Sequence, residues 1–142
     1  MTSIKDIWNE HRALEARAAQ LLQIVASPVP DPAAVAAVRW DMAQALAQHC
    51  AREDREVYAP LLASDDAEAR LAARHLNEEQ GMLARRFADY AARWPVARMA
   101  REWEVFRSDT AALLLDLKRR ITREERELHP HLARIEHRRA AA

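Results

Sequence analysis

Residues 31–62 read DPAAVAAVRWDMAQALAQHCAREDREVYAPLL, and this stretch decides the fold. Asp31 followed by Pro32 is typical of a helix start, because an Asp side chain caps free backbone N–H groups and proline fits the first helical turn. From there apolar side chains recur every three or four residues, the period of one helix face. The stretch therefore predicts one long helix, whose buried face also carries a His and a Glu. That face comprises Val35, Val38, Met42, Leu46, His49, Glu53, Val57 and Leu61.

Three further helices are predicted from the same period. Proline and helix-capping residues separate the helical segments at 27–32, 64–66 and 94–95. Short connections make consecutive helices antiparallel neighbours. The fold class is therefore all-α, an antiparallel up-down-up-down four-helix bundle, with a frayed C-terminal tail. The predicted helices cover residues 3 to about 24, 32–62, 67–93 and about 103–128.

Length and composition agree with one domain over residues 1–142. The chain has one Gly and 31% charged residues, the composition of packed helices. Lys plus Arg and Asp plus Glu are 22 each, so no positive excess is available for nucleic acid or an anionic membrane, and neither is an expected partner. No signal peptide or membrane span is read, and the lone Cys50 forms no intrachain disulfide. A cytoplasmic protein is expected.

Each predicted helix carries polar residues on the face that should be buried. A buried polar group without a partner costs on the order of 2 to 7 kcal/mol, so each of them needs one. The i, i+4 spacing within the pairs places both side chains on one helix face. Counted from the helix ends, the three histidines fall at one level of the bundle, which predicts a metal site there. The residues are His11, His49, Glu53, His75, Glu79, Arg120 and Glu124.

The fourth helix does not meet this level directly. Counted from Pro95, the level falls near residues 109–114 and not at Arg120 and Glu124. The register is restored if residues 96 to about 104 overhang the bundle or form a separate short helix. Both arrangements stay open.

The sequence resembles the hemerythrin-like, HHE cation-binding family over essentially the whole chain. Four motifs carry the resemblance: EHRAL around His11, HCAREDREVYAP at 49–60, RHLNEE around His75 and REERELHP at 123–130. It implies a carboxylate-bridged di-iron centre. Imidazole and carboxylate ligands suit iron, and also manganese or zinc. By resemblance the ligands are His11, His49, Glu53, His75 and Glu124 or Glu125.

Two positions depart from the family pattern. Members usually carry a His four residues before the last carboxylate, where this chain has Arg120, which cannot lose its proton to become a ligand. On the third helix the family often places a His directly after paired glutamates, where this chain has Gln80. The ligand there would be His75 in a shifted register, and the part of Glu79 stays open. Alternatively, Arg120 among Glu53, Glu79 and Glu124 replaces the metal charge in an ion-free site.

The resemblance implies a non-enzymatic domain that binds dioxygen, nitric oxide or iron for sensing, carriage or protection. The alternative is a degenerate, metal-free or mononuclear bundle that acts as an interaction module, with a second copy or an unknown protein as partner. A ferritin-like di-iron enzyme is disfavoured, because the Glu-x-x-His spacing that it requires occurs nowhere in the chain. Two smaller questions stay open. His129, His131 and His137 form either a second metal patch or ordinary surface, and Cys50 is either redox-sensitive or fills space.

Overall fold

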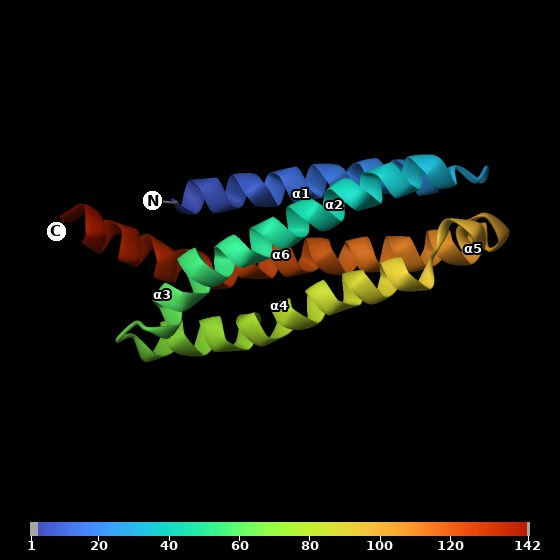
Figure 1. The fold of residues 1–142 in the computed structure, drawn as a ribbon. Coiled ribbons are helices and arrows are strands. Elements are labelled where there is room, and N and C mark those ends of the chain that lie inside the picture. Colours follow the sequence, from blue (N-terminus) through green and yellow to red (C-terminus); the bar gives the residue numbers. More distant parts are fainter. Residues whose placement is uncertain (1–2, 142) are drawn as a thin grey trace.

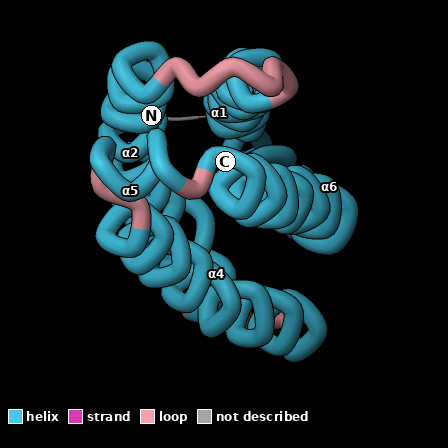
Figure 2. The backbone as a smooth tube through the Cα atoms, turned by 90° about the vertical axis from the view of Figure 1, so that its right-hand side faces the viewer, coloured by secondary structure: helices cyan, strands magenta, loops and turns pink. Residues whose placement is uncertain are grey.

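The computed structural model describes residues 3–141, and within them every regular element is a helix. Four long helical segments run along one another and form a single bundle, with α5 at the end opposite both termini (Figure 1). Figure 2 shows the bundle end-on, so that α1, α2, α4 and α6 are viewed approximately along their axes. The elements are α1 (Ile4–Val25), α2 (Pro32–Glu53), η1 (Asp54–Tyr58), α3 (Ala59–Leu62), α4 (Ala67–Arg93), α5 (Val96–Arg101) and α6 (Trp103–Ala141).

The helix starts lie where the capping residues predict them. The Ser3 side chain accepts a hydrogen bond from the backbone of Asp6, whose own side chain caps the backbone of Ser3. Asp31 caps α2 through the backbone N–H of Ala34, with Pro32 as the first helical residue. These caps stabilise the N-termini of the two helices that supply the first candidate ligands.

The predicted helix over 32–62 is continuous but consists of three parts, α2, the π-helical turn η1 and α3. In η1 the backbone N–H of Ala59 bonds to the carbonyl of Asp54, five residues back. The wider turn buries the adjacent residues Val57 and Tyr58 together. It follows Glu53 directly, so the π turn determines what lies next to a candidate ligand. The sequence pattern did not predict it.

The register of the fourth helix is resolved by the short helix α5. Residues 96–101 form this separate element, and α6 begins only at Trp103. The prediction that the C-terminal tail is frayed is wrong, because α6 continues to Ala141. Its last part changes direction (Figure 1), as expected near Pro130, which lacks the N–H needed for the helical hydrogen bond.

The core consists of two apolar clusters with a polar layer between them. The larger cluster holds Leu14 of α1, Leu46 of α2 and Phe87 of α4, and the smaller one holds Ile7 of α1 and Leu76 of α4. Along each long segment the buried His, Gln and Glu side chains come between members of the two clusters. The layer therefore lies inside the protein, closed off by apolar packing on both sides. Its buried members are His11, His49, Glu53, Gln80, Arg120 and Glu124.

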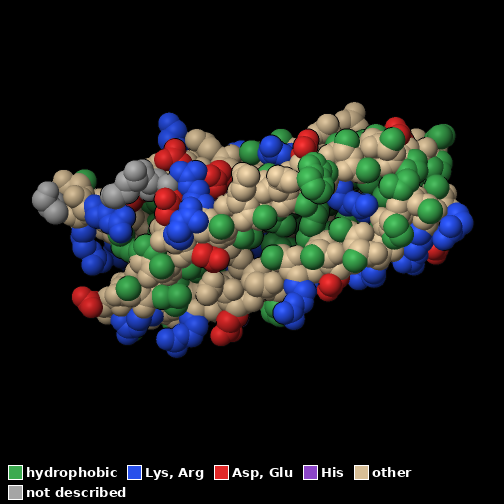
Figure 3. Space-filling view, in the orientation of Figure 1, with side chains coloured by type: hydrophobic (Ala, Val, Ile, Leu, Met, Phe, Trp, Pro, Cys, Tyr) green, Lys and Arg blue, Asp and Glu red, His purple; other side chains and the backbone are tan. Residues whose placement is uncertain are grey.

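The surface shows no concentration of one charge on the face drawn in Figure 3. Lys and Arg side chains along α4 alternate with Asp and Glu, which agrees with the formal net charge of +0. Among residues 3–141, none of the helices combines the length and apolar composition needed to cross a bilayer.

Candidate metal centre

Four side chains converge in the polar layer from three helices. His11 comes from α1, His49 and Glu53 from the end of α2, and Glu124 from α6. Each offers one ligand atom, and these atoms all lie within 4.8 Å of one another. Bonds of about 2.0–2.2 Å to nitrogen or oxygen hold the ligands of one ion at comparable separations. Among residues 3–141, this is the one group of three or more such side chains that converges in this way.

The contacts within the cluster are close and leave some atoms unpaired. Nε2 of His11 lies 3.0 Å from Oε1 of Glu124 and 3.8 Å from Oε2 of Glu53. Nε2 of His49 lies 2.5 Å from Oε1 of Glu53. Oε2 of Glu53 and Nδ1 of His11 are buried without a hydrogen-bond partner, which costs about 1–3 kcal/mol for each group. An imidazole and carboxylate set with an unpaired carboxylate oxygen, Oε2 of Glu53, fits a divalent transition-metal ion.

In the absence of an ion, protons hold the cluster together. Burial by itself lowers the pKa of His11, but hydrogen bonds with Glu124 and Glu53 outweigh this and raise it to about 9. Burial and the neighbouring Glu53 carboxyl raise the pKa of Glu124 to about 7. Burial opposes the charge on Glu53 too, yet hydrogen bonds with Glu124, His11 and His49 hold its pKa well below the usual range. A metal ion would have to displace the proton that the His11 imidazole holds in this state.

Glu10 orients one of the imidazoles from outside the cluster. Its Oε1 lies 2.7 Å from Nδ1 of His49, and Arg52 donates to its other oxygen. A carboxylate at Nδ1 favours a proton on that nitrogen, so an ion that replaced the proton between Nε2 and Glu53, 2.5 Å apart, would meet the lone pair of Nε2. Sequence reasoning missed Glu10. It stands beside His11 in the motif EHRAL, but no spacing rule distinguishes it from the other charged residues of α1.

Arg120 lies at the edge of the cluster and is engaged by several groups. It is buried, donates to the Tyr58 hydroxyl at 3.0 Å and to the carbonyl of Leu76, and lies 3.6 Å from Oε2 of Glu124. A further bond of 3.2 Å joins it to Glu79. The Tyr58 hydroxyl in turn donates to Glu124 at 2.6 Å. A fixed guanidinium charge therefore stands next to the candidate ligands.

The third helix contributes differently from the prediction. The placement of His75 on the buried face is wrong: its side chain is 62% exposed and lies 3.3 Å from Glu79. Glu79 is 30% exposed and pairs with Arg120 and Arg123. Gln80 is the residue of α4 that enters the polar layer. The buried residues of α4, Ala69, Ala73, Leu76, Phe87 and Tyr90, continue through Gln80 at helical spacing, a signal present in the sequence.

The structure also distinguishes between the two adjacent acidic residues of α6, Glu124 and Glu125. Glu124 is buried in the cluster, whereas Glu125 is 21% exposed and is held in a two-pronged contact by Arg12. Oε1 of Glu125 lies 3.7 Å from Nδ1 of His11, beyond hydrogen-bond distance. Glu124 is the carboxylate placed to act as ligand, and Glu125 lies behind His11.

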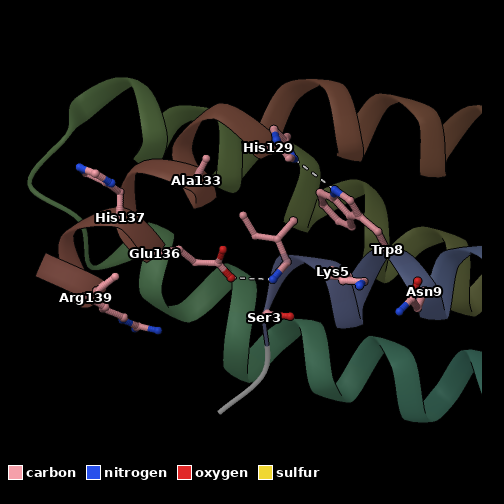
Figure 4. A pocket seen from close by; sticks show the side chains of 11 residues that line it. Ser3, Lys5, Trp8, Asn9, His129, Ala133, Glu136, His137 and Arg139 are labelled. Atoms are coloured by element: carbon pink, nitrogen blue, oxygen red, sulfur yellow. Dashed lines mark hydrogen bonds between the residues drawn. The ribbon is translucent and has the colours of Figure 1, made fainter.

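Trp8 lines a surface pocket of about 900 Å³ (Figure 4) and also contacts His11 of the cluster. Its ring stacks on His11 at a centroid distance of 5.0 Å, and its Nε1 donates to Nδ1 of His129 at 3.1 Å. The pocket lies between the start of α1 and the end of α6. His129 and His137 line it, but in the described part of the chain they do not converge with a third ligand. His131 instead faces Asp66 and Arg134, so the ordinary-surface interpretation fits these histidines.

Cys50 lies beside the cluster without the character of a reactive thiol. Burial, together with the nearby Glu53 carboxylate, raises the pKa of its thiol to about 12. The thiolate is the reactive form, so this environment disfavours reaction and supports the space-filling interpretation.

The fold and the buried cluster together define a four-helix bundle with a histidine and carboxylate cation site. A family model, the hemerythrin HHE cation binding domain, matches residues 2–132, and the chain belongs to this family. No curated protein and no solved structure matches the chain.

Proposed function

We propose that this chain is a non-enzymatic iron-binding domain of the cytoplasm that binds or senses dioxygen, nitric oxide or iron itself. One observation carries the proposal. Four buried ligand side chains converge between two apolar clusters, and two of their polar atoms have no partner in the protein. Natural proteins rarely leave a buried carboxylate oxygen such as Oε2 of Glu53 unpaired, so its place among these side chains points to an ion.

The residues in and around the cluster would have different roles in such a site. His11, His49, Glu53 and Glu124 would hold the ion, and Glu10 keeps His49 in the tautomer that can bind it. Trp8 covers His11 and restricts the access of water. Bound iron supplies a coordination position at which a small ligand binds reversibly.

The geometry supports one ion per chain better than two. A second ion needs ligands from α4, and His75 and Glu79 do not join the cluster. On that side Arg120 supplies a permanent positive charge next to Glu124. A guanidinium cannot give up its proton to bind metal, so we propose that Arg120 replaces the second cation.

Metal content per chain, measured with an absorption spectrum after anaerobic loading with ferrous iron, tests the proposal. We expect about one iron per chain in the wild type and none in the double variant His49→Ala, Glu53→Ala. His75→Ala is the matched control, because it removes an exposed histidine and should leave iron content unchanged. No iron in the loaded wild type would refute the proposed function, and two would refute the single-ion arrangement.

An ion-free interaction module is the second candidate, and one observation favours it. Arg120 with Glu79 and Glu124, and His49 with Glu10 and Glu53, already form a network of ion pairs without metal. Such a bundle would bind a second copy or another protein. The two functions differ in their response to a chelator. An ion that binds the folded state alone stabilises it by mass action, so chelation lowers the Tm of a metal protein and leaves that of an interaction module unchanged.

A further inference from the structure

A small cavity adjoins the metal cluster on the side of α4. It has a volume of about 20 Å³ and is lined by the four candidate ligands and by apolar side chains that include Leu83, Leu117 and Ile121. A cavity needs roughly 10–15 Å³ of this kind of volume to hold one water molecule. The space is therefore enough for a water molecule or a ligand of similar size, and too small for an organic substrate.

Gln80 is the polar side chain of α4 that borders this cavity. It is 5% exposed, and neither its Oε1 nor its Nε2 has a hydrogen-bond partner. The Cys50 thiol is near enough for the amide to lower the thiol pKa, against the larger rise caused by burial, but the contact falls short of a hydrogen bond. An unpaired buried amide costs about 1–3 kcal/mol, so this position lowers the stability of the bundle.

Arg120 also borders the cavity but has its donors in use. Its terminal nitrogens donate to Glu79, to the Tyr58 hydroxyl and to the carbonyl of Leu76. The side-chain amide of Gln80, in contrast, has neither of its polar atoms in a hydrogen bond. It reaches the cavity from the helix that supplies no candidate ligand.

We propose that Gln80 is the specificity-determining contact for the small ligand, donating a hydrogen bond from its side-chain amide to a ligand of diatomic size that accepts one. This inference rests on the proposed function and adds the residue that selects the ligand. A donor fixed beside this cavity favours a ligand with an accepting end, such as dioxygen or nitric oxide, because the ligand satisfies an amide that is otherwise unpaired. The stability lost at Gln80 in the empty protein is regained when the ligand binds.

The test compares nitric oxide binding to the iron-loaded full chain with and without the amide. Gln80→Leu and Gln80→Met keep the approximate volume and remove the donor, and Gln44→Leu, on the exposed face of α2, is the matched control. We expect both Gln80 variants to retain iron and to bind nitric oxide about 3- to 10-fold more weakly, the value of one net hydrogen bond. The control should bind like the wild type.

A second measurement needs neither iron nor nitric oxide. In the metal-free protein, removing an unpaired buried amide should raise the Tm of Gln80→Leu or Gln80→Met, whereas Gln44→Leu should leave it nearly unchanged. A lowered Tm in both variants would show that the amide is satisfied inside the protein and would overturn the inference.

The remaining outcomes separate the inference from the function on which it rests. Unchanged nitric oxide affinity in a folded, iron-loaded Gln80 variant overturns the inference and leaves the proposed function standing. Loss of iron from both variants also overturns it, because Gln80 would then be a metal ligand through Oε1. A wild type that takes up no iron, or takes up iron and binds no nitric oxide, overturns both the inference and the ligand-binding function.

Discussion

α2 and α4 each carry a His four residues before a Glu, yet the two pairs lie in opposite surroundings. His49 and Glu53 are 5% and 3% exposed and lie in the metal cluster, whereas His75 and Glu79 are 62% and 30% exposed and lie at the surface. The spacing is identical in the two pairs, so it cannot be the cause of their different exposure. The cause is the phase of each pair relative to the apolar side chains of its own helix, which pass through His49 on α2 and through Gln80 on α4.

In the proposed function one half of the polar layer binds a cation and the other half supplies one, and the phase of the two pairs would be the reason. On the α2 side Glu53 faces Nε2 of His11, and Glu10 of α1 holds the second candidate ligand, His49, through its Nδ1. On the α4 side the same level is occupied by Gln80 and by the contacts of Arg120. The two halves of the polar layer therefore have different chemistry, and each can be altered separately.

Removing an imidazole from each side should give the largest contrast. We expect His49→Ala to weaken iron binding by about 100-fold or more, because it removes a ligand and leaves Glu53 without its closest partner. His75→Ala should leave the affinity unchanged and cost no more than about 0.5 kcal/mol of stability, the value of an exposed i, i+4 pair. Competition with a coloured chelator measures both. Equal losses in the two variants would contradict the assignment of α4 to the non-ligand side.

Substitutions on the α4 side should remove the difference in metal binding between the two halves of the polar layer. The double variant Gln80→His, Arg120→His places two imidazoles at buried positions next to Glu124 and removes the fixed charge. We expect its iron content to rise from about one to about two per chain, with the single variant Gln80→His as control, because Arg120 still repels a second cation there. Metal analysis after anaerobic loading measures the change. An unchanged content in the double variant would show that Arg120 is not what limits the site to one ion.

Substitution of Glu10 tests whether its carboxylate supports metal binding by orienting His49, a contact that has no counterpart on the α4 side. Glu10→Gln keeps the shape of the side chain but removes the charge that favours the proton on Nδ1 of His49. Loss of such an outer partner typically weakens metal binding about 10- to 100-fold. Glu15→Gln, one turn further along α1 and paired with Arg12, is the control and should bind iron like the wild type. If both variants bind alike, His49 is oriented by packing and not by Glu10.

Much of this arrangement could be predicted from the sequence, and the errors have a physical pattern. Helix boundaries and the inward direction of His11, His49 and Glu53 follow from capping residues and long apolar faces, which are local properties. The face of α4 was misassigned because its seam includes small alanines such as Ala69 and Ala73, which mark a buried face less clearly than Leu or Val. The contact of Glu10 with His49 depends on a partner distant in sequence, and the spacing of apolar residues does not predict the π turn η1.

Tyr58 connects the two sides, and its hydroxyl gives the smallest of the expected effects. It donates to Glu124 at 2.6 Å and accepts from Arg120 at 3.0 Å, so it holds the ligand and the fixed cation in register. Tyr58→Phe should cost about 1–2 kcal/mol in the metal-free protein, because a hydrogen bond to a charged group is lost at a buried site. Tyr90→Phe is the control, since its hydroxyl bonds to the neutral Thr110 in the larger apolar cluster and its loss should cost about 1 kcal/mol. Urea unfolding measures the stability of both variants.

Of the two variants, only Tyr58→Phe should also change the iron affinity, because Glu124 is then fixed by Arg120 alone from the α4 side. An equal iron affinity in Tyr58→Phe and Tyr90→Phe would mean that the two halves of the polar layer act independently.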